Sequence, residues 1–188
     1  MPRLNAIDAA VGARLIGRGA VVAYPTEACF GIGCDPNNPI AVRRIAAIKN
    51  RPSGKGFIII ADRFESLAPY LSFDDPSIMK QPLSTWPGPY TWILPASAAA
   101  QKLGSAVDGK IAVRVTAHPV AARLCQLAGG AIISTSANSH GNKPIRKYLE
   151  VSRVLGPRVD FVVRGTLGKK TRPTQIRDAA TGALIRAG

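Results

Sequence analysis

Short apolar runs of strand length alternate with segments of helical period along the whole chain, and this interleaving is the feature that most constrains the fold. Buried strands that alternate with amphipathic helices are typical of the α/β class, in which helices cover a sheet. We therefore expect a single domain over residues 1–188, built on a twisted, mixed sheet with flanking helices. The expected strands are 20–24, 56–61, 90–95, 110–115, 131–134, 161–164, 174–179 and 184–186.

Capping residues and prolines indicate where the helices begin. A first helix is expected over about 5–18, and a second starts at Pro39 with Asn38 as its N-cap. Asn is a favoured capping residue, and Pro is favoured at the first helical position. Further expected elements are helices at 119–128 and 147–155, a short helix from Asp62 toward Tyr70, and a loop at Gly31-Ile32-Gly33.

The charge balance indicates an anionic partner. The chain has 25 Lys and Arg against 11 Asp and Glu, a formal net charge of +14. This excess is larger than solubility requires, and counterion release makes such a surface attractive to nucleic acid phosphates. It also suits a small anionic substrate. A solvated basic surface without a partner stays open as the third interpretation.

Two further observations bear on the compartment. No run of eighteen apolar residues occurs, and the N-terminus lacks an apolar secretory stretch, so we expect no membrane contact. The three cysteines, Cys29, Cys34 and Cys125, are few and odd in number. Such a set is typical of a reducing cytosol, and a cytoplasmic protein is expected.

Four segments place polar groups where an expected strand or helix ends. The first is Tyr24-Pro25-Thr26-Glu27, which leaves a buried strand ahead of the two glycines at 31 and 33. Glycines allow the backbone to approach a ligand closely. An ordinary strand-to-loop turn explains the same residues.

The second segment is Lys49-Asn50-Arg51-Pro52, with Lys55 following. Pro52 disfavours the helical conformation for the residue before it, so Lys49 and Arg51 can converge on one anion. Simple capping of a helix C-terminus by basic side chains is an equally good explanation.

The third segment is the strand 110–115, in which Ile111, Val113 and Val115 share one face. Lys110 and Arg114 lie on the other face, because side chains alternate across a strand. That face borders either solvent or a cleft.

The fourth segment follows a buried strand and reads Ser134-Thr135-Ser136-Ala137-Asn138. If the chain stays extended, Ser134, Ser136 and Asn138 point the same way and can bind phosphate or carboxylate oxygens. A turn-forming cluster remains the alternative.

Several common enzyme motifs are missing from the sequence. There is no G-x-x-x-x-G-K-[ST] phosphate loop, no complete dinucleotide fingerprint and no G-x-S-x-G nucleophile elbow. His118 and His140 have no metal-like spacing; His118 is placed to cap a helix and His140 lies in a polar loop. No carboxylate pair suits acid–base catalysis, and we expect no metal-ligating residues in the protein.

The four segments, in this order and with additional matches, resemble the YrdC/TsaC family of threonylcarbamoyl-AMP synthases in its short bacterial form. The similarity runs from about residue 8 to the C-terminus. The matching stretches are Tyr24-Pro25-Thr26-Glu27, Phe30-Gly31-Ile32-Gly33, Lys49-Asn50-Arg51-Pro52, Trp86-Pro87-Gly88-Pro89 with Thr91, Ala112-Val113-Arg114 with His118-Pro119, Ser134-Thr135-Ser136-Ala137-Asn138 and Ile176-Arg177-Asp178.

The resemblance implies a deep, positively charged cavity and an enzyme that acts on ATP, L-threonine and bicarbonate. The product would be threonylcarbamoyl-AMP with release of pyrophosphate, a nucleotidyltransferase reaction that serves N6-threonylcarbamoyladenosine modification of tRNA next to the anticodon. Mg²⁺ would arrive with ATP, held mostly by substrate oxygens and water. The expected partners are tRNA, bound weakly, and the proteins that transfer the threonylcarbamoyl group.

The family's Lys-x-Arg and Ser-x-Asn pairs fall on two matching pairs here, and the other predicted roles complete the site. The predicted catalytic residues are Lys49, Arg51, Ser136 and Asn138. The predicted threonine-binding residues are Tyr24, Thr26, Arg114 and Ser134. The predicted ATP-binding residues are Arg51, Lys55, Lys110, Ser136, Asn138 and Thr174, although many relatives carry a polar amide at the position of Lys55.

This chemistry suits such a site. Threonine and carbon dioxide form a carbamate without a strong base, and the carbamate then attacks the α-phosphorus of ATP. Both reactants are anions, so positioning and charge stabilisation are the protein's main tasks. The alternative is a basic RNA-binding module that acts on ribosomal or structured RNA without catalysis.

Overall fold

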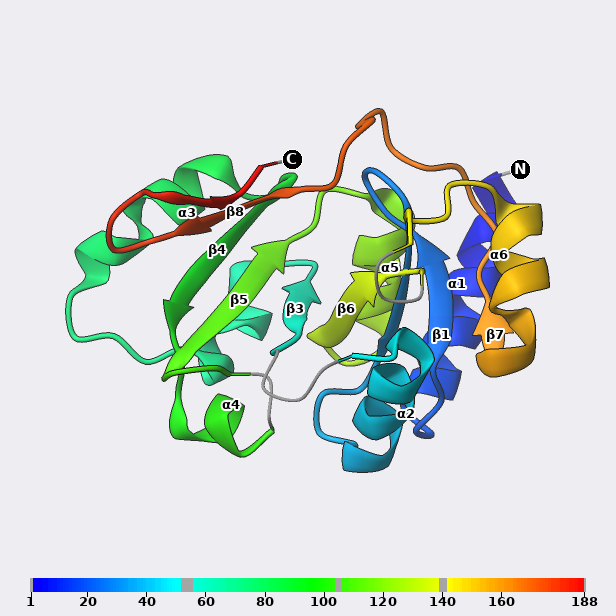
Figure 1. Ribbon diagram of the computed structural model, residues 1–188, viewed down its shortest axis with the longest axis horizontal. Helices are drawn as coiled ribbons and strands as arrows, with labels where there is room; N and C mark the ends of the chain where they lie inside the picture. The colour runs from blue at the N-terminus through cyan, green and yellow to red at the C-terminus, as the bar shows by residue number, and fades with distance from the viewer. Residues whose placement is uncertain (1, 52–55, 104–105, 139–141, 188) are drawn as a thin grey trace.

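The computed structural model describes residues 2–51, 56–103, 106–138 and 142–187 (Figure 1). Its strands are β1 Val22–Pro25, β2 Phe30–Cys34, β3 Ile58–Ala61, β4 Tyr90–Pro95, β5 Lys110–Val115, β6 Ile132–Ser136, β7 Phe161–Val162, β8 Gln175–Asp178 and β9 Leu184–Arg186. Its α-helices are α1 Pro2–Ile16, α2 Pro39–Lys49, α3 Lys80–Thr85, α4 Ala98–Lys102, α5 Pro119–Leu127 and α6 Tyr148–Val154. Short 3₁₀ turns lie at 64–66, 68–70, 76–79 and 156–158.

The described strands form one mixed sheet in the order β7-β1-β2-β6-β3-β5-β4-β8-β9. Neighbours pair antiparallel except for β1 with β7, β3 with β5 and β4 with β8, which are parallel. The chain therefore crosses the molecule once more after β7, because β8 joins the opposite end of the sheet, as the segment running from β7 to β8 in Figure 1 shows. The α/β class and the mixed sheet expected from the sequence are confirmed.

The register gives the two faces of the sheet different characters. Ile32, Ile133, Ile59 and Val113 belong to one face, which we call the apolar face, and their side chains are fully buried. Helices α2 and α6 pack on this face near β1 and β2. The 3₁₀ turns near Leu67 and the helix α4 pack on it near β4 and β5.

The other face, which we call the polar face, carries Ser134, Ala112 and Arg114 in the central strands. Helices α1 and α5 cover only part of this face, where they bury Val22, Tyr24, Ile60 and Ile132. The remaining part of the polar face is lined by polar side chains, and it is here that a cavity opens.

Most expected elements are confirmed, with ends that move by one to three residues. The carbonyl oxygen of the Asn38 side chain accepts hydrogen bonds from the amides of Ile40 (3.0 Å) and Ala41 (3.1 Å), as expected for the N-cap of α2. The amide of Ala121 donates to His118 Nδ1 at 3.4 Å, so His118 caps α5. Strands β4 and β5 have the expected bounds.

The predicted loop at Gly31-Ile32-Gly33 is wrong, because these residues form the middle of β2. The glycines are needed for close packing rather than for a turn. A Cβ at Gly33 would lie 2.3 Å from the carbonyl oxygen of Ile133 and 2.9 Å from the Tyr24 hydroxyl. Glycine in a strand interior often marks such a close approach.

The short helix expected from Asp62 toward Tyr70 is confirmed only as helical turns, and the cap predicted at Asp62 is wrong. The segment forms two separate 3₁₀ turns, and Arg63 rather than Asp62 precedes the first without making a side-chain cap. Pro69 has no amide hydrogen for a helical bond to residue 65, so a continuous helix cannot pass through it. Asp62 instead pairs with Arg63 at 3.6 Å.

Candidate active site

A cavity of about 360 Å³ lies on the polar face of the sheet, over β2, β6, β3 and β5. Apart from Ile58, its floor consists of small or polar residues, because Gly31, Ser134 and Ala112 have little or no apolar side chain to fill the space. The other residues around it are Thr26, Ala28, Cys29, Lys49, Arg51, Gly56, Ile58, Arg114, Thr135, Ser136, Asn138, Pro144, Pro173, Thr174, Ile176 and Arg186.

Lys49 reaches the carboxyl end of β6 from the last turn of α2. Its ammonium donates to the carbonyl oxygens of Ser136 and Asn138, each at 2.7 Å, and to the Asn138 side chain. The Ser136 hydroxyl donates to the same Asn138 side-chain oxygen at 2.6 Å. Lys49 therefore fixes the Ser-x-Asn pair, which the sequence alone left either as a ligand site or as a turn.

Burial and, to a smaller extent, repulsion from the nearby Arg51 guanidinium together lower the pKa of Lys49 to about 8. A lysine with this pKa is charged at neutral pH but loses its proton only slightly above it. Loss of that proton would remove the positive charge and one of the three N–H donors that Lys49 directs to Ser136 and Asn138.

Arg51 enters the cavity beyond the end of α2. The helix ends at Asn50, which has a left-handed backbone (φ 46°), a conformation that Asn tolerates better than most residues. The break therefore occurs one residue before the position at which the sequence predicted it, and Pro52 lies outside the described residues. The Arg51 guanidinium donates to the carbonyl of Gly56 and stacks on the ring of Phe57, 4.6 Å from its centroid.

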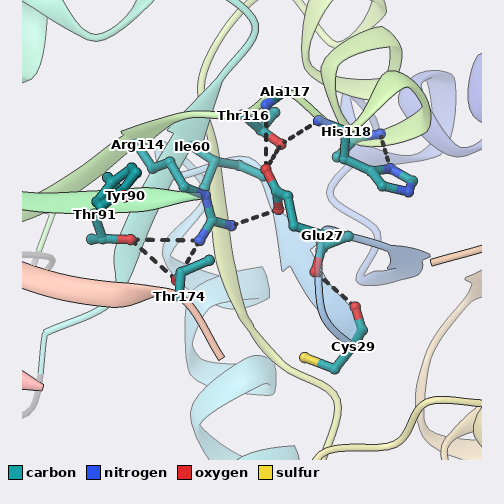
Figure 2. Close-up of polar contacts among 12 residues, drawn as sticks. Glu27, Cys29, Ile60, Tyr90, Thr91, Arg114, Thr116, Ala117, His118 and Thr174 are labelled. Atoms are coloured by element: carbon teal, nitrogen blue, oxygen red, sulfur yellow. Dashed lines mark hydrogen bonds and ion pairs between the residues drawn. The ribbon is translucent and has the colours of Figure 1, made fainter. Parts of the chain in front are cut away.

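Arg114 lies at the back of the cavity with only 6% of its side chain exposed. Figure 2 shows its guanidinium between two threonines and a carboxylate: Nη1 donates to the hydroxyl of Thr174 at 2.8 Å and lies 3.5 Å from that of Thr91. Nη2 is 3.7 Å from Glu27 Oε2. The sequence left this face of β5 as either solvent or a cleft, and the structure shows that at Arg114 it is a cleft.

Glu27 is the buried counterion of Arg114. Its Oε1 accepts hydrogen bonds from the Thr116 hydroxyl at 2.6 Å and from the Ala117 amide at 3.3 Å (Figure 2). Burial alone would raise the pKa of this carboxyl, but the charge of Arg114 and the bond from Thr116 outweigh it and hold the pKa below its ordinary value. Glu27 therefore stays ionised at neutral pH and orients the guanidinium toward the cavity.

Eight of the predicted site residues line this one cavity. They come from five separate parts of the chain and are Thr26, Lys49, Arg51, Arg114, Ser134, Ser136, Asn138 and Thr174. Ser134 and Ser136 point the same way, as the extended conformation of β6 requires.

Two predicted residues do not line the cavity, and a third cannot be placed. Lys110 stands at the opposite end of β5, where its ammonium pairs with Asp178 at 2.9 Å. Tyr24 is fully buried against Gly33 and helix α5, so its ring lies beneath the cavity wall; burial raises the pKa of its hydroxyl. Lys55 and His140 lie outside the described residues.

Sequence reasoning missed three residues of the site. Glu27 was part of a recognised segment, but nothing in the sequence indicated that Arg114 would be its partner. Arg186 lines the cavity from the end of β9. Cys29 also lines the cavity, and its carbonyl oxygen accepts a hydrogen bond from the Thr26 hydroxyl. A basic residue in an otherwise apolar strand, Leu184-Ile185-Arg186, is the signal that could have identified Arg186.

The cavity suits anions. Four cationic side chains line it, from Lys49, Arg51, Arg114 and Arg186, and no Asp or Glu is among the described lining residues. Within the described part of the chain, no cluster of three His, Cys, Asp or Glu could hold a metal ion. Hydroxyl, amide and cationic groups are the donors that bind phosphate and carboxylate oxygens.

Known proteins resemble this chain over most of its length. The family model Sua5/YciO/YrdC, described as "Telomere recombination", matches residues 14–188. A Halorhodospira halophila protein named threonylcarbamoyl-AMP synthase is 50% identical over 169 residues, which cover 90% of this chain and 88% of that protein. A Vibrio vulnificus protein of the same name is 44% identical over 177 residues, covering 93% of this chain and 95% of that protein.

Solved structures share the fold. E. coli YciO superposes with a TM-score of 0.83 at 28% identity, covering 96% of this chain and 88% of that one. P. abyssi Sua5 complexed with L-threonine superposes with a TM-score of 0.83 at 27% identity over 90% of this chain. The match covers 50% of the P. abyssi chain, so the present chain spans about half the length of that protein.

Proposed function

The chain belongs to the Sua5/YciO/YrdC family, and we propose that it is a threonylcarbamoyl-AMP synthase that supplies the activated group for N6-threonylcarbamoyladenosine in tRNA. Relatives that carry this name match it over nearly their whole length, and a Sua5 structure in the same fold holds L-threonine. The enzyme is a transferase, and the finer class we propose is a nucleotidyltransferase that uses ATP, L-threonine and bicarbonate.

One observation carries this proposal: four cations converge on one cavity whose described lining has no carboxylate. The reaction brings together the carboxylate and carbamate of the amino acid and the triphosphate of ATP. A carbamate oxygen attacks the α-phosphorus, the bond from that phosphorus to the bridging oxygen breaks, and pyrophosphate leaves with the electron pair. Such a step depends on alignment and charge stabilisation more than on a general base.

We assign the threonine carboxylate to Arg114, which Glu27 and Thr174 hold in a fixed orientation. Thr26 and Ser134, at the same end of the cavity floor, contact the rest of the amino acid in this proposal. Tyr24 lies behind them, and its role is to shape the wall rather than to contact the substrate.

We assign the carbamate and the phosphates to the Lys-x-Arg and Ser-x-Asn pairs. Arg51, Ser136 and Asn138 are the groups that contact the substrate. Lys49 contributes its charge and acts mainly as a positioning residue, because its donors are directed to Ser136 and Asn138. Thr174 contributes by holding Arg114.

Magnesium enters this proposal only with the nucleotide. The donor set of the cavity is cationic or neutral among the described residues, so it offers no carboxylate to a divalent ion. Phosphate oxygens and water would hold the ion, as Mg²⁺ commonly requires. When bound, it would neutralise charge on the phosphates, and the protein groups named above would orient them.

No described helix is long and apolar enough to span a membrane. The three cysteines are free thiols. We propose that the enzyme works in the cytoplasm, where its tRNA pathway would also lie. The alternative of a non-catalytic RNA-binding module has no support among the relatives, which are named for synthesis.

The test is pyrophosphate release by the purified chain with each substrate omitted in turn, and identification of the nucleotide product by mass. We expect release only when ATP, L-threonine and bicarbonate are all present, with a product of the mass of threonylcarbamoyl-AMP. Release that is independent of threonine, or none from a folded protein, would overturn the proposal.

A further inference from the structure

Part of the cavity wall comes from the long segment that crosses from β7 to β8 (Figure 1). We call residues 166–174 of this crossing the wall segment, because Pro173 and Thr174 at its end line the cavity. Thr174 also holds the buried guanidinium of Arg114, whose Nη1 donates to the threonine hydroxyl at 2.8 Å. The position of the wall segment therefore affects how the proposed threonine-binding arginine is oriented.

The first half of the wall segment is attached through its own backbone. The Gly168 amide donates to the carbonyl oxygen of Thr26 at 3.0 Å, and the Lys170 amide donates to that of Glu27 at 3.1 Å. A Cβ at Gly168 would lie 2.7 Å from the Glu27 carbonyl oxygen, so the two backbones approach closely because this residue is glycine. These backbone bonds end at Lys170, before the segment reaches Thr174.

Arg146 holds the second half of the wall segment from the other side. It lies between β6 and α6, and its Nη1 donates to the carbonyl oxygens of Lys170 at 3.2 Å and of Thr171 at 3.1 Å. The same nitrogen donates to the carbonyl oxygen of Ala28, which lines the cavity. Within the described part of the chain, residues 171–173 make no other hydrogen bond.

The hydrogen bonds of Arg146 are directed to backbone carbonyls and not to the cavity. Arg146 is not among the described residues that line the cavity, so no substrate group is assigned to it. A planar guanidinium can serve carbonyl oxygens from two segments at once, which a single ammonium does less well. Because its side chain is exposed, removal of Arg146 leaves no buried charge behind and should loosen the wall segment without unfolding the protein.

We propose that Arg146 is a positioning residue for the reaction: it holds the wall segment against Ala28, so that Thr174 keeps Arg114 in the orientation that the threonine carboxylate requires. This inference rests on the proposed function, because the assignment of threonine to Arg114 belongs to that function. It adds no covalent step, and Arg146 contacts neither substrate.

The experiment compares Arg146→Ala, Arg146→Lys and a matched control, Arg123→Ala, with the wild type. Arg123 is also an exposed arginine, but it donates to the side chain of Gln126 within α5 and not to the wall segment. Calorimetric titrations measure Kd for L-threonine and for ATP, and steady-state assays measure KM for each substrate and kcat. Urea unfolding measures the stability of each variant.

For Arg146→Ala we expect Kd and KM for threonine to rise about fivefold, the factor that corresponds to one hydrogen bond of typical net strength. KM for ATP should change less than about twofold, because the phosphates are assigned to groups outside the wall segment. Arg146→Lys should recover part of the loss, since an ammonium can still donate to some of the carbonyl oxygens. Arg123→Ala should leave the constants for both substrates at their wild-type values.

A double-mutant cycle with Thr174→Val tests whether Arg146 acts through Thr174. Valine removes the hydroxyl that accepts the hydrogen bond from Arg114. If Arg146 acts through that bond, adding Arg146→Ala to Thr174→Val should raise KM for threonine by less than about twofold further. A second rise as large as that in the wild-type background would show that the two residues act independently and would overturn the proposal.

The outcomes separate the two proposals. If the wild type forms no threonylcarbamoyl-AMP, the proposed function fails, and Kd for threonine still tests Arg146. If the wild type is active and Arg146→Ala binds threonine normally, the role assigned to Arg146 is wrong. Equal losses for threonine and ATP in Arg146→Ala would also overturn it, because they would reflect a general disturbance of the cavity.

Discussion

Lys110 and Arg114 project from the same face of β5, four residues apart, yet they occupy different environments. Arg114 has 6% of its side chain exposed and lines the cavity, whereas Lys110 has 54% exposed and pairs with Asp178 outside it. The alternation of a strand determines which face a residue occupies, but the segments that cover that face determine what it can do. At Arg114, Glu27 and Thr174 approach from distant parts of the chain, and at Lys110 they do not.

The contrast between cations inside and outside the cavity holds for the other described basic residues too, since only a few of them line the cavity. Lys169, Lys170 and Arg172 are exposed on the segment that crosses from β7 to β8. The cations behind the net charge of +14 therefore include a set that lines the cavity and an exposed set that faces solvent. The following predictions separate these two parts, beginning with the largest expected effect.

The sharpest test compares the stability of Arg114→Ala with that of Lys110→Ala. Removal of Arg114 leaves the Glu27 carboxylate buried without its cation, which should lower the free energy of unfolding by about 3 kcal/mol. Removal of Lys110 breaks a pair whose lysine is mostly exposed and should lower it by less than about 1 kcal/mol. Urea unfolding measures both, and similar losses would show that the two ends of β5 are equivalent.

Arg114→Lys tests the substrate assignment with the charge kept. A lysine cannot bond Thr174 and a carboxylate with the same fork of nitrogens, so KM for threonine should rise about tenfold. KM for ATP should change less than about twofold, and Lys110→Ala should alter neither value. Separate titrations of each substrate provide the measurement, and equal losses for threonine and ATP would contradict the assignment.

The lowered pKa of Lys49 predicts that activity falls at alkaline pH. Its pKa is lowered to about 8, so its ammonium is lost in the folded protein as pH rises through that value. Turnover should decline above about pH 8, because Lys49 then loses its charge and one of the three N–H donors that it directs to Ser136 and Asn138.

Deprotonation of Lys49 should have the opposite effect on the stability of the fold, which it should increase. The unfolded chain keeps the Lys49 proton up to a pKa near 10.5, so the unfavourable burial of the charged lysine is fully present below pH 8 and is relieved between pH 8 and 10.5. Wild-type protein should gain stability from this group in that window while it loses activity. A Lys49→Met variant should lack this contribution, and an unchanged profile of unfolding against pH would contradict the interpretation.

The smallest effect on catalysis is expected from substitutions of the exposed cations. Reversal of Lys169, Lys170 and Arg172 to Glu should leave threonylcarbamoyl-AMP formation within about twofold of wild type, because surface charges act weakly at a distance in salt. The same variant should bind tRNA more weakly, with a smaller dependence of affinity on salt. Wild-type tRNA binding that is absent at low salt, or unchanged in the variant, would show that this surface serves only solubility.

The fold was largely predictable because its elements depend on local patterns. The alternation of apolar and polar residues over 110–115 predicted the bounds of β5, and the Asn38-Pro39 pair predicted where α2 begins. The loop predicted at Gly31-Ile32-Gly33 failed for a tertiary reason, because a side chain at Gly33 would clash with the Ile133 carbonyl and the Tyr24 hydroxyl. The continuous helix predicted from Asp62 failed for a local reason, because Pro69 lacks the amide hydrogen that such a helix needs.

The site was predictable where its residues follow each other closely in sequence. Ser136 with Asn138, and Lys49 with Arg51, are pairs that reach the cavity together. Partnerships between distant segments left no trace in a single sequence. Glu27 pairs with Arg114 from a different strand region, and Thr174 accepts a hydrogen bond from Arg114 although the two residues are 60 positions apart. The predicted roles of these residues in binding and catalysis remain to be tested by the variants above.

The crossing from β7 to β8 has a consequence for how the enzyme is made. Lys49, Arg51, Arg114, Ser136 and Asn138 leave the ribosome first, and Thr174 and Arg186 follow only with the last two strands. A nascent or clipped chain that ends before β8 would contain the described helices and seven of the nine described strands, but Arg114 would lack Thr174 and the cavity would lack Arg186. Synthesis therefore completes the lining of the described cavity only once β8 and β9 have been made, after all its other described strands.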